Sequence, residues 1–171
     1  MEIFIARQPI FDRSERVVAY ELLYRASSSA DRAEGVDPDR MAHEVLLGSV
    51  FGAGLPRIVQ DAAAFVNTTR SLLLSGALDL LDPRTVVIEV LETVEPDAEV
   101  LAACEALVAR GFRLALDDVV LDSRIEPLLG LASIVKVDVL AQPPETLSGI
   151  REQLAPYGVT LLAEKVESAA V

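Results

Sequence analysis

The segment Leu114-Ala115-Leu116-Asp117-Asp118 is a short apolar strand that ends on two adjacent carboxylates. Neighbouring side chains of a strand point to opposite faces, so two acids at its end can reach two different neighbours, including two metal ions. An Asp-Asp pair after a strand is also common in solvated turns and at helix N-caps. The residues that end the other strands therefore decide whether this segment belongs to a turn or to a site.

Working outward from this segment, apolar strands alternate with amphipathic helices. Before it we expect strands at 2–10, 16–25, 63–67 and 85–91 and helices at 40–51, 71–78 and 97–110. After it we expect helices at 125–131 and 145–155 and strands at 133–138 and 159–164. The first two strands form an antiparallel pair joined by a short polar link, and residues 26–38 form a surface loop. Apolar strands separated by helices indicate an α/β protein with a parallel sheet, and both an open doubly wound sheet and a (β/α) barrel satisfy this pattern.

The composition restricts the class of protein. The chain of 171 residues is long enough for one domain, and although 51% of it is hydrophobic, no run is long enough to predict a membrane span. A net charge of −12 argues against a nucleic-acid surface, which needs clustered Lys and Arg. The N-terminal sequence lacks the pattern of a signal peptide, so we expect a cytoplasmic protein in which the single cysteine, Cys104, is a buried thiol.

Several common catalytic motifs are absent from the sequence. No glycine-rich nucleotide-binding motif follows any expected strand. His43 and Cys104 are the only residues of their types, which excludes a Cys/His zinc site and disfavours a Ser-His-Asp triad. We therefore expect His43 to be a surface or hydrogen-bonded residue of the first helix.

Polar and charged residues recur at the carboxyl ends of the expected strands. They are Glu21, Asn67, Glu89, Asp117 with Asp118, Lys136 with Asp138, and Glu164. Active sites of α/β barrels and open sheets assemble at this edge. Carboxylate and amide oxygens suit Mg²⁺ or Mn²⁺, and two ions about 3.5–4 Å apart suit in-line displacement at a phosphate. In such a site Lys136 would orient the attacking water, and Arg25 would bind a phosphate.

Seven short motifs, spread in order over nearly the whole chain, resemble those of EAL domains, the bacterial phosphodiesterases that open cyclic di-GMP to linear pGpG. These motifs are Arg7-Gln8-Pro9-Ile10, Glu21-Leu22-Leu23-Tyr24-Arg25, Phe65-Val66-Asn67, Glu89-Val90-Leu91-Glu92, Leu116-Asp117-Asp118, Val135-Lys136-Val137-Asp138 and Ala163-Glu164-Lys165-Val166-Glu167. The first segments are most similar to the EAL half of EAL-HDOD signalling proteins.

The resemblance implies a TIM-like (β/α) barrel with an antiparallel first strand, incomplete at the C-terminus and formed by residues 1–171 as one domain. It implies that two Mg²⁺ or Mn²⁺ ions are held by Glu21, Asn67, Glu89, Asp117 and Asp118. It implies catalytic roles for Lys136 and Glu164, substrate contacts for Gln8 and Arg25, and supporting acids at Glu92, Asp138 and Glu167. The implied partners are cyclic di-GMP and either a second copy of the chain or a C-terminal HDOD domain.

The sequence departs from the family at two places. The run Asp118-Val119-Val120-Leu121-Asp122-Ser123 contains no glycine where active members have Asp-Phe-Gly-Thr-Gly. The chain also ends at Val171, where the family continues into a last strand and helix. Two functions follow from the sequence: hydrolysis of cyclic di-GMP by a two-metal mechanism, or a non-catalytic signalling module that binds nucleotide or a protein partner.

Overall fold

The computed structural model describes residues 4–25, 37–48, 54–118 and 121–166, and the following statements concern these residues. Seven strands form one sheet in the order of the sequence, from β1 to β7. β1 runs antiparallel to β2, and each later strand runs parallel to the one before it. The strands are β1 (Phe4–Phe11), β2 (Val17–Arg25), β3 (Ala63–Thr68), β4 (Val86–Val90), β5 (Arg113–Leu116), β6 (Ile134–Asp138) and β7 (Thr160–Glu164).

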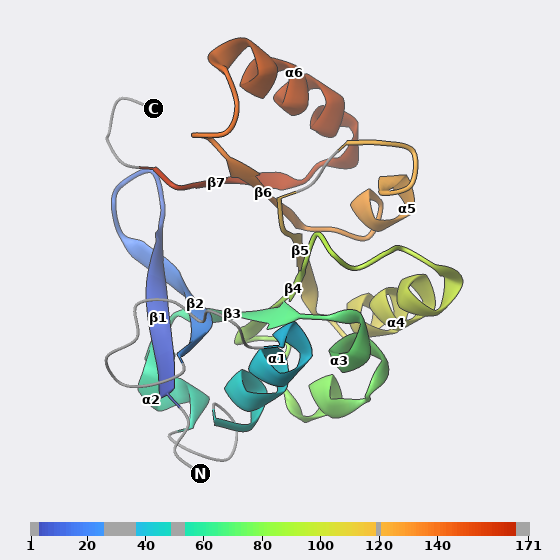
Figure 1. The fold of residues 1–171 in the computed structure, drawn as a ribbon. Helices are drawn as coiled ribbons and strands as arrows, with labels where there is room; N and C mark the ends of the chain where they lie inside the picture. Colours follow the sequence, from blue (N-terminus) through green and yellow to red (C-terminus); the bar gives the residue numbers. More distant parts are fainter. Residues whose placement is uncertain (1–3, 26–36, 49–53, 119–120, 167–171) are drawn as a thin grey trace.

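The sheet curls, and the helices that connect its parallel strands lie on its outer side (Figure 1). The longer helices are α1 (Pro38–Leu47), α4 (Ala98–Ala109) and α6 (Pro144–Leu154). The shorter ones are α2 (Leu55–Val59), α3 (Arg70–Leu74), α5 (Glu126–Leu129) and the 3₁₀ turns η2 (Ala77–Leu80) and η3 (Ala155–Tyr157). A doubly wound sheet would reverse its strand order at a switch point, whereas this order is sequential. The predicted TIM-like barrel with an antiparallel first strand is therefore confirmed, as a curled and incomplete barrel.

Two apolar clusters occupy the two faces of the sheet. The larger one lies between the strands and the helices and includes Leu22, Ile88 and Leu114 with residues of α1 and α4. The smaller one consists of Ala19, Phe65, Val87 and Ala115, with Ile10, Ala63, Ile134 and Leu162 packed against it. Because side chains alternate along a strand, this smaller cluster lies on the inner face of the curl. We call it the inner apolar layer.

Some helices differ from the sequence-based expectation. The helix expected at 71–78 is divided into α3 and η2, because Gly76 adopts a left-handed φ of 74° that ends the helical path. The helix expected at 40–51 begins earlier, at Pro38, where the side chain of Asp37 accepts a hydrogen bond from the backbone of Asp39. Its expected end and most of the 26–38 loop lie outside the described residues.

The two residues expected to be structural have the expected environments. Cys104 is fully buried in the outer core. The ring Nδ1 of His43 lies 2.8 Å from the backbone oxygen of Asp39 in the same helix. None of the helices in the described ranges is long and apolar enough to cross a membrane.

Candidate active site

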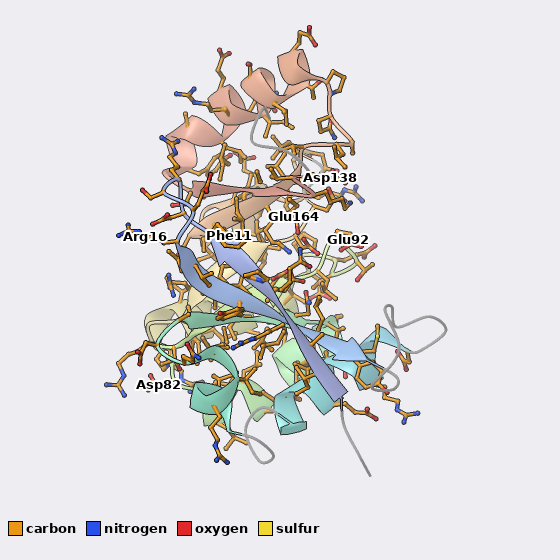
Figure 2. All side chains as sticks on the ribbon, turned by 90° about the vertical axis from the view of Figure 1, so that its left-hand side faces the viewer. Phe11, Arg16, Asp82, Glu92, Asp138 and Glu164 are labelled. Carbon is orange, nitrogen blue, oxygen red and sulfur yellow. The ribbon has the colours of Figure 1, made fainter. Side chains whose placement is uncertain are left out.

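The polar residues predicted at the strand ends form a layer next to the inner apolar layer. Six of the eight, all except Asp118 and Asp138, follow an inner apolar residue by two positions, and residues two apart on a strand share a face. The pairs are Ala19 and Glu21, Phe65 and Asn67, Val87 and Glu89, Ala115 and Asp117, Ile134 and Lys136, and Leu162 and Glu164. This layer lies at the carboxyl ends of the parallel strands. Figure 2 shows Glu92 and Asp138 toward this edge, with Arg16 and Asp82 toward the opposite one.

Lys136 on β6 lies at the centre of the polar layer. Its Nζ is 2.5 Å from Oε1 of Glu89, 2.7 Å from Oε1 of Glu164, 3.1 Å from Oδ1 of Asp117 and 3.4 Å from Oε2 of Glu21. The side chain of Lys136 is 2% exposed and that of Glu89 is 0% exposed. The ammonium therefore links carboxylates from β2, β4, β7 and the end of β5. We call these five side chains the Lys136 cluster.

Burial and charge shift the proton affinities within the Lys136 cluster. Burial, together with the neighbouring Glu21 and Asp117, raises the pKa of Glu89 to about 8, although Lys136 acts in the opposite direction. Burial also raises the pKa of Glu164. For Lys136, burial lowers the pKa but the surrounding carboxylates raise it by more, so the ammonium stays charged.

The donor chemistry of the site fits a hard divalent cation. As they stand, no three or more His, Cys, Asp or Glu side chains of the described residues are arranged to hold a metal ion, and the carboxylates contact Lys136 instead. However, Oε2 of Glu89 is buried without a hydrogen-bond partner, which is costly for a carboxylate oxygen. Asn67 donates from Nδ2 to Oε1 of Glu21 at 3.2 Å, a bond that does not use its amide oxygen. These oxygen donors are of the type that Mg²⁺ and Mn²⁺ prefer.

The two adjacent aspartates have different environments. Asp117 joins the Lys136 cluster, whereas Asp118 is exposed and adopts a left-handed φ of 40°. Such a conformation is uncommon for a residue with a side chain and marks a sharp change of direction after β5. That the two carboxylates reach two different neighbours or metal ions stays a prediction.

The remaining predicted residues lie around the site. Gln8 is exposed and pairs with Glu21 across β1 and β2, which puts both on the same face of the sheet. Arg25 is the last residue of β2, and its side chain is outside the description. Glu92 is exposed just after β4, Asp138 is buried at the end of β6, and Glu167 lies beyond the described residues.

Sequence reasoning assigned no role to Lys165. The structure shows that it pairs with Asp138, directly beside the Lys136 cluster. A signal was present in the sequence, because Lys136 and Lys165 are the only two lysines of the chain and all thirteen other basic residues are arginines.

A pocket of about 360 Å³ adjoins the Lys136 cluster. Glu21, Asn67 and Asp117 form its polar part, and its apolar walls come from β2, α1 and the residue after β4, namely Leu23, Tyr24, Met41, Val45 and Leu91. A larger cleft of about 930 Å³ is lined by part of the inner apolar layer, including Ala19 and Phe65, and by residues at the amino ends of the strands. None of the five residues of the Lys136 cluster lines it. We assign the smaller pocket to the site because it joins apolar walls to converging polar groups.

The chain was compared with known proteins by sequence and by fold. No protein-family model matches the chain. The chain is 34% identical over 173 residues to the uncharacterised protein YuxH of Bacillus subtilis, covering 98% of this chain and 42% of YuxH. It is 32% identical over 167 residues to the cyclic di-GMP phosphodiesterase CdgJ of Vibrio cholerae, covering 96% of this chain and 39% of CdgJ. The chain thus spans about two fifths of the length of these relatives.

The fold is also that of a solved EAL-domain structure. The Bacillus subtilis YkuI protein, which contains an EAL domain and was crystallised with cyclic di-GMP and calcium, superposes with a TM-score of 0.75 at 21% identity. The match covers 97% of this chain and 49% of that one. The curled sheet and its antiparallel first strand are therefore an EAL-type TIM-like fold.

Proposed function

We propose that this chain, which has the fold of an EAL domain, binds cyclic di-GMP and hydrolyses it to linear pGpG with the help of two Mg²⁺ or Mn²⁺ ions. The observation that carries the proposal is the layer of oxygen ligands and one buried lysine at the strand ends. The similarity to CdgJ, a cyclic di-GMP phosphodiesterase, supports the choice of substrate. Residues 1–171 are treated in this proposal as one domain.

The metal ligands proposed are Glu21, Asn67, Glu89, Asp117 and Asp118. Bound divalent cations would supply positive charge to the phosphoryl oxygens and acidify the attacking water. Lys136 keeps its proton, so it acts as a hydrogen-bond donor that orients the water.

The substrate would lie with its scissile phosphate above the Lys136 cluster. Attack of water on phosphorus forms one P–O bond and breaks the bond to the ribose oxygen, which leaves as the hydroxyl of linear pGpG. Glu164 contacts the ammonium of Lys136 at 2.7 Å and so holds it in place during this step. The apolar walls of the 360 Å³ pocket offer Tyr24 and Leu91 as surfaces for a guanine base. Substrate contacts from Gln8 and Arg25, and supporting roles for Glu92 and Glu167, stay predictions.

The wider context of the domain is also part of the proposal. As in the sequence analysis, we propose that it works with a second copy of itself or with an HDOD domain, and that it binds neither nucleic acid nor membranes. A cytoplasmic location stays a prediction.

A second candidate function is a signalling module that binds cyclic di-GMP without turnover. It is favoured by the run from Asp118 to Ser123, which has no glycine. Glycine readily adopts left-handed backbone conformations, whereas a β-branched residue such as valine rarely does. A loop with a different backbone preference would place Asp118 differently relative to Asp117 and weaken a second metal site.

Two measurements on the purified chain distinguish hydrolysis of cyclic di-GMP from binding without turnover. Conversion of cyclic di-GMP is followed by ion-exchange chromatography with Mg²⁺ or Mn²⁺, and binding is measured by calorimetry. Glu89→Gln should abolish conversion, whereas Arg84→Ala, which removes an exposed ion pair with Asp82 at the opposite edge of the sheet, should not. Formation of pGpG supports hydrolysis, binding without pGpG supports the second function, and the lack of both contradicts each of them.

A further inference from the structure

We propose that Lys165 is a positioning residue for the Lys136 cluster: its ion pair with Asp138 fixes the end of β7 and thereby the carboxylate of Glu164. The part of this inference that concerns turnover rests on the proposed phosphodiesterase function. The structural part, that loss of Lys165 alters the surroundings of Lys136, is independent of that function.

The two lysines of the chain lie close to each other in the fold. The chain has 15 basic residues, of which only Lys136 and Lys165 are lysines. They belong to neighbouring strand ends, on β6 and just after β7. Both lysines of the chain therefore lie at this edge of the sheet. The property of Lys165 that the proposal requires is its positive charge next to Asp138.

The partner of Lys165 is well fixed. Nζ of Lys165 donates a hydrogen bond to Oδ2 of Asp138. Oδ1 of the same carboxylate accepts hydrogen bonds from the backbone N–H groups of Leu140 at 2.9 Å and Ala141 at 3.0 Å. The side chain of Asp138 is 7% exposed and that of Lys165 is 59% exposed. Lys165 is therefore tied to a rigid turn rather than to a mobile surface carboxylate.

The ion pair between Lys165 and Asp138 also restrains Glu164, the residue before Lys165. The backbone oxygen of Glu164 accepts a hydrogen bond from Val139 at 3.3 Å. In the described sheet β7 is an edge strand that pairs with β6 alone, so few contacts hold its end. Lys165 also has a left-handed φ of 56°, which is strained for a residue with a side chain. The ion pair with Asp138 offsets this strain and keeps the end of β7 in place.

Glu164 in turn contacts Lys136. Oε1 of Glu164 lies 2.7 Å from Nζ of Lys136, and Lys136 and Asp138 are two residues apart on β6. Two ion pairs, Lys165 with Asp138 and Lys136 with Glu164, together with the backbone of β6 and β7, thus form a closed ring. Loss of the Lys165 ammonium opens this ring and frees Glu164 to move relative to Lys136.

The test uses the fact that the chain has two lysines. Protein labelled with ¹⁵N only in lysine gives two side-chain ammonium signals by NMR, and Lys165→Gly removes one of them. Glycine accepts the left-handed φ at this position, so this variant removes the ion pair without adding backbone strain. We expect the remaining Lys136 signal to shift in Lys165→Gly and in Asp138→Asn, but to stay in place in Lys165→Arg and in the control Arg84→Ala.

Turnover gives the second readout. Lys165→Gly should lower kcat for cyclic di-GMP by about tenfold with KM nearly unchanged, because a displaced catalytic group costs rate more than binding. Lys165→Arg should restore most of the rate, and the melting temperature of Lys165→Gly should not fall. An unshifted Lys136 signal in Lys165→Gly overturns the inference, as does full kcat in that variant. If the unmodified chain itself shows no turnover, the proposed hydrolysis fails, while the NMR signal still decides the role of Lys165.

Discussion

Replacement of Lys136 by methionine should destabilise the protein in a strongly pH-dependent way. The ammonium is 2% exposed and contacts four carboxylates, of which that of Glu89 is fully buried. Methionine fills a similar volume but leaves these carboxylates without their common partner. Removal of one member of a buried ion pair typically costs about 3–5 kcal/mol, because the other charge stays buried and unpaired. We expect a loss of this size above a pH of about 8, where Glu89 is ionised in the unmodified chain.

The sign of the pH dependence follows from Glu89. Burial, with Glu21 and Asp117, already raises the pKa of Glu89 from its ordinary 4.5 to about 8 while Lys136 opposes the shift. Without Lys136 the pKa rises further. A carboxyl whose pKa is raised by folding favours the folded state below its unfolded pKa, and this contribution is lost as the pH rises through the folded pKa. From Glu89, both proteins lose stability alike between pH 4.5 and about 8, so the extra destabilisation in Lys136→Met should be small near pH 4.5 and grow only above a pH of about 8.

Urea unfolding of Lys136→Met and of the unmodified chain near pH 4.5 and above a pH of about 8 measures the effect. Arg84→Met is the matched control, because its exposed pair with Asp82 should contribute little to stability. Excess Mg²⁺ should restore part of the stability of Lys136→Met by binding the freed carboxylates in the folded state. An equal loss at both pH values, or a loss no larger than that of Arg84→Met, would refute the reasoning.

Two further predictions concern parts of the fold away from the site. Burial raises the pKa of the Cys104 thiol from 9.0 to about 11, so between these pH values the folded protein keeps a proton that the unfolded chain loses. The free energy of unfolding should therefore fall by up to about 1.4 kcal/mol per pH unit over this range. Unfolding of Cys104→Ala at the same pH values should lack this slope, and an identical slope would contradict the burial argument. In α6, Gly149→Ala should raise stability by about 0.5–1 kcal/mol, since nothing lies within 4 Å of the added carbon. Gly76→Ala should lower stability by about 1 kcal/mol or more, because alanine is strained at the φ of 74°. If thermal melts showed Gly149→Ala and Gly76→Ala changing the melting temperature in the same direction, this prediction would be wrong.

The strands were largely predictable from sequence because their period and boundaries are local properties. Apolar runs bounded by Gly, Pro and Asp predicted all seven strands of the described sheet to within a few residues. The polar strand ends were predictable as a group, since the carboxyl ends of parallel strands meet at one edge. The inner apolar layer explains why they also share a face: Val87 and Glu89, for example, are two residues apart.

The central position of Lys136 was not predictable in the same way. The sequence suggested that Lys136 orients water, but its contacts with Glu21 on β2 and Glu89 on β4 depend on how strongly the sheet curls. Curvature arises from the packing of all strands and helices together and leaves no local pattern. The pairing of Lys165 with Asp138 is hidden for the same reason, since the two residues are 27 positions apart.

The charge balance of the Lys136 cluster sets the order in which cation and nucleotide bind. Four carboxylates meet one ammonium, which gives a net charge of −3 with all groups ionised, and of −2 when Glu89 holds a proton below a pH of about 8. A phosphodiester brings further negative charge to this buried site, so like charges oppose its binding until a divalent cation reverses the local sign. Calorimetry should therefore detect cyclic di-GMP binding with Ca²⁺ or Mg²⁺ present and lose it with a chelator. Glu89→Gln removes the negative charge that Glu89 carries above a pH of about 8 without adding a cation, and it should not restore binding in the chelator. Equal affinity with and without the cation would show that the phosphate does not lie above the Lys136 cluster.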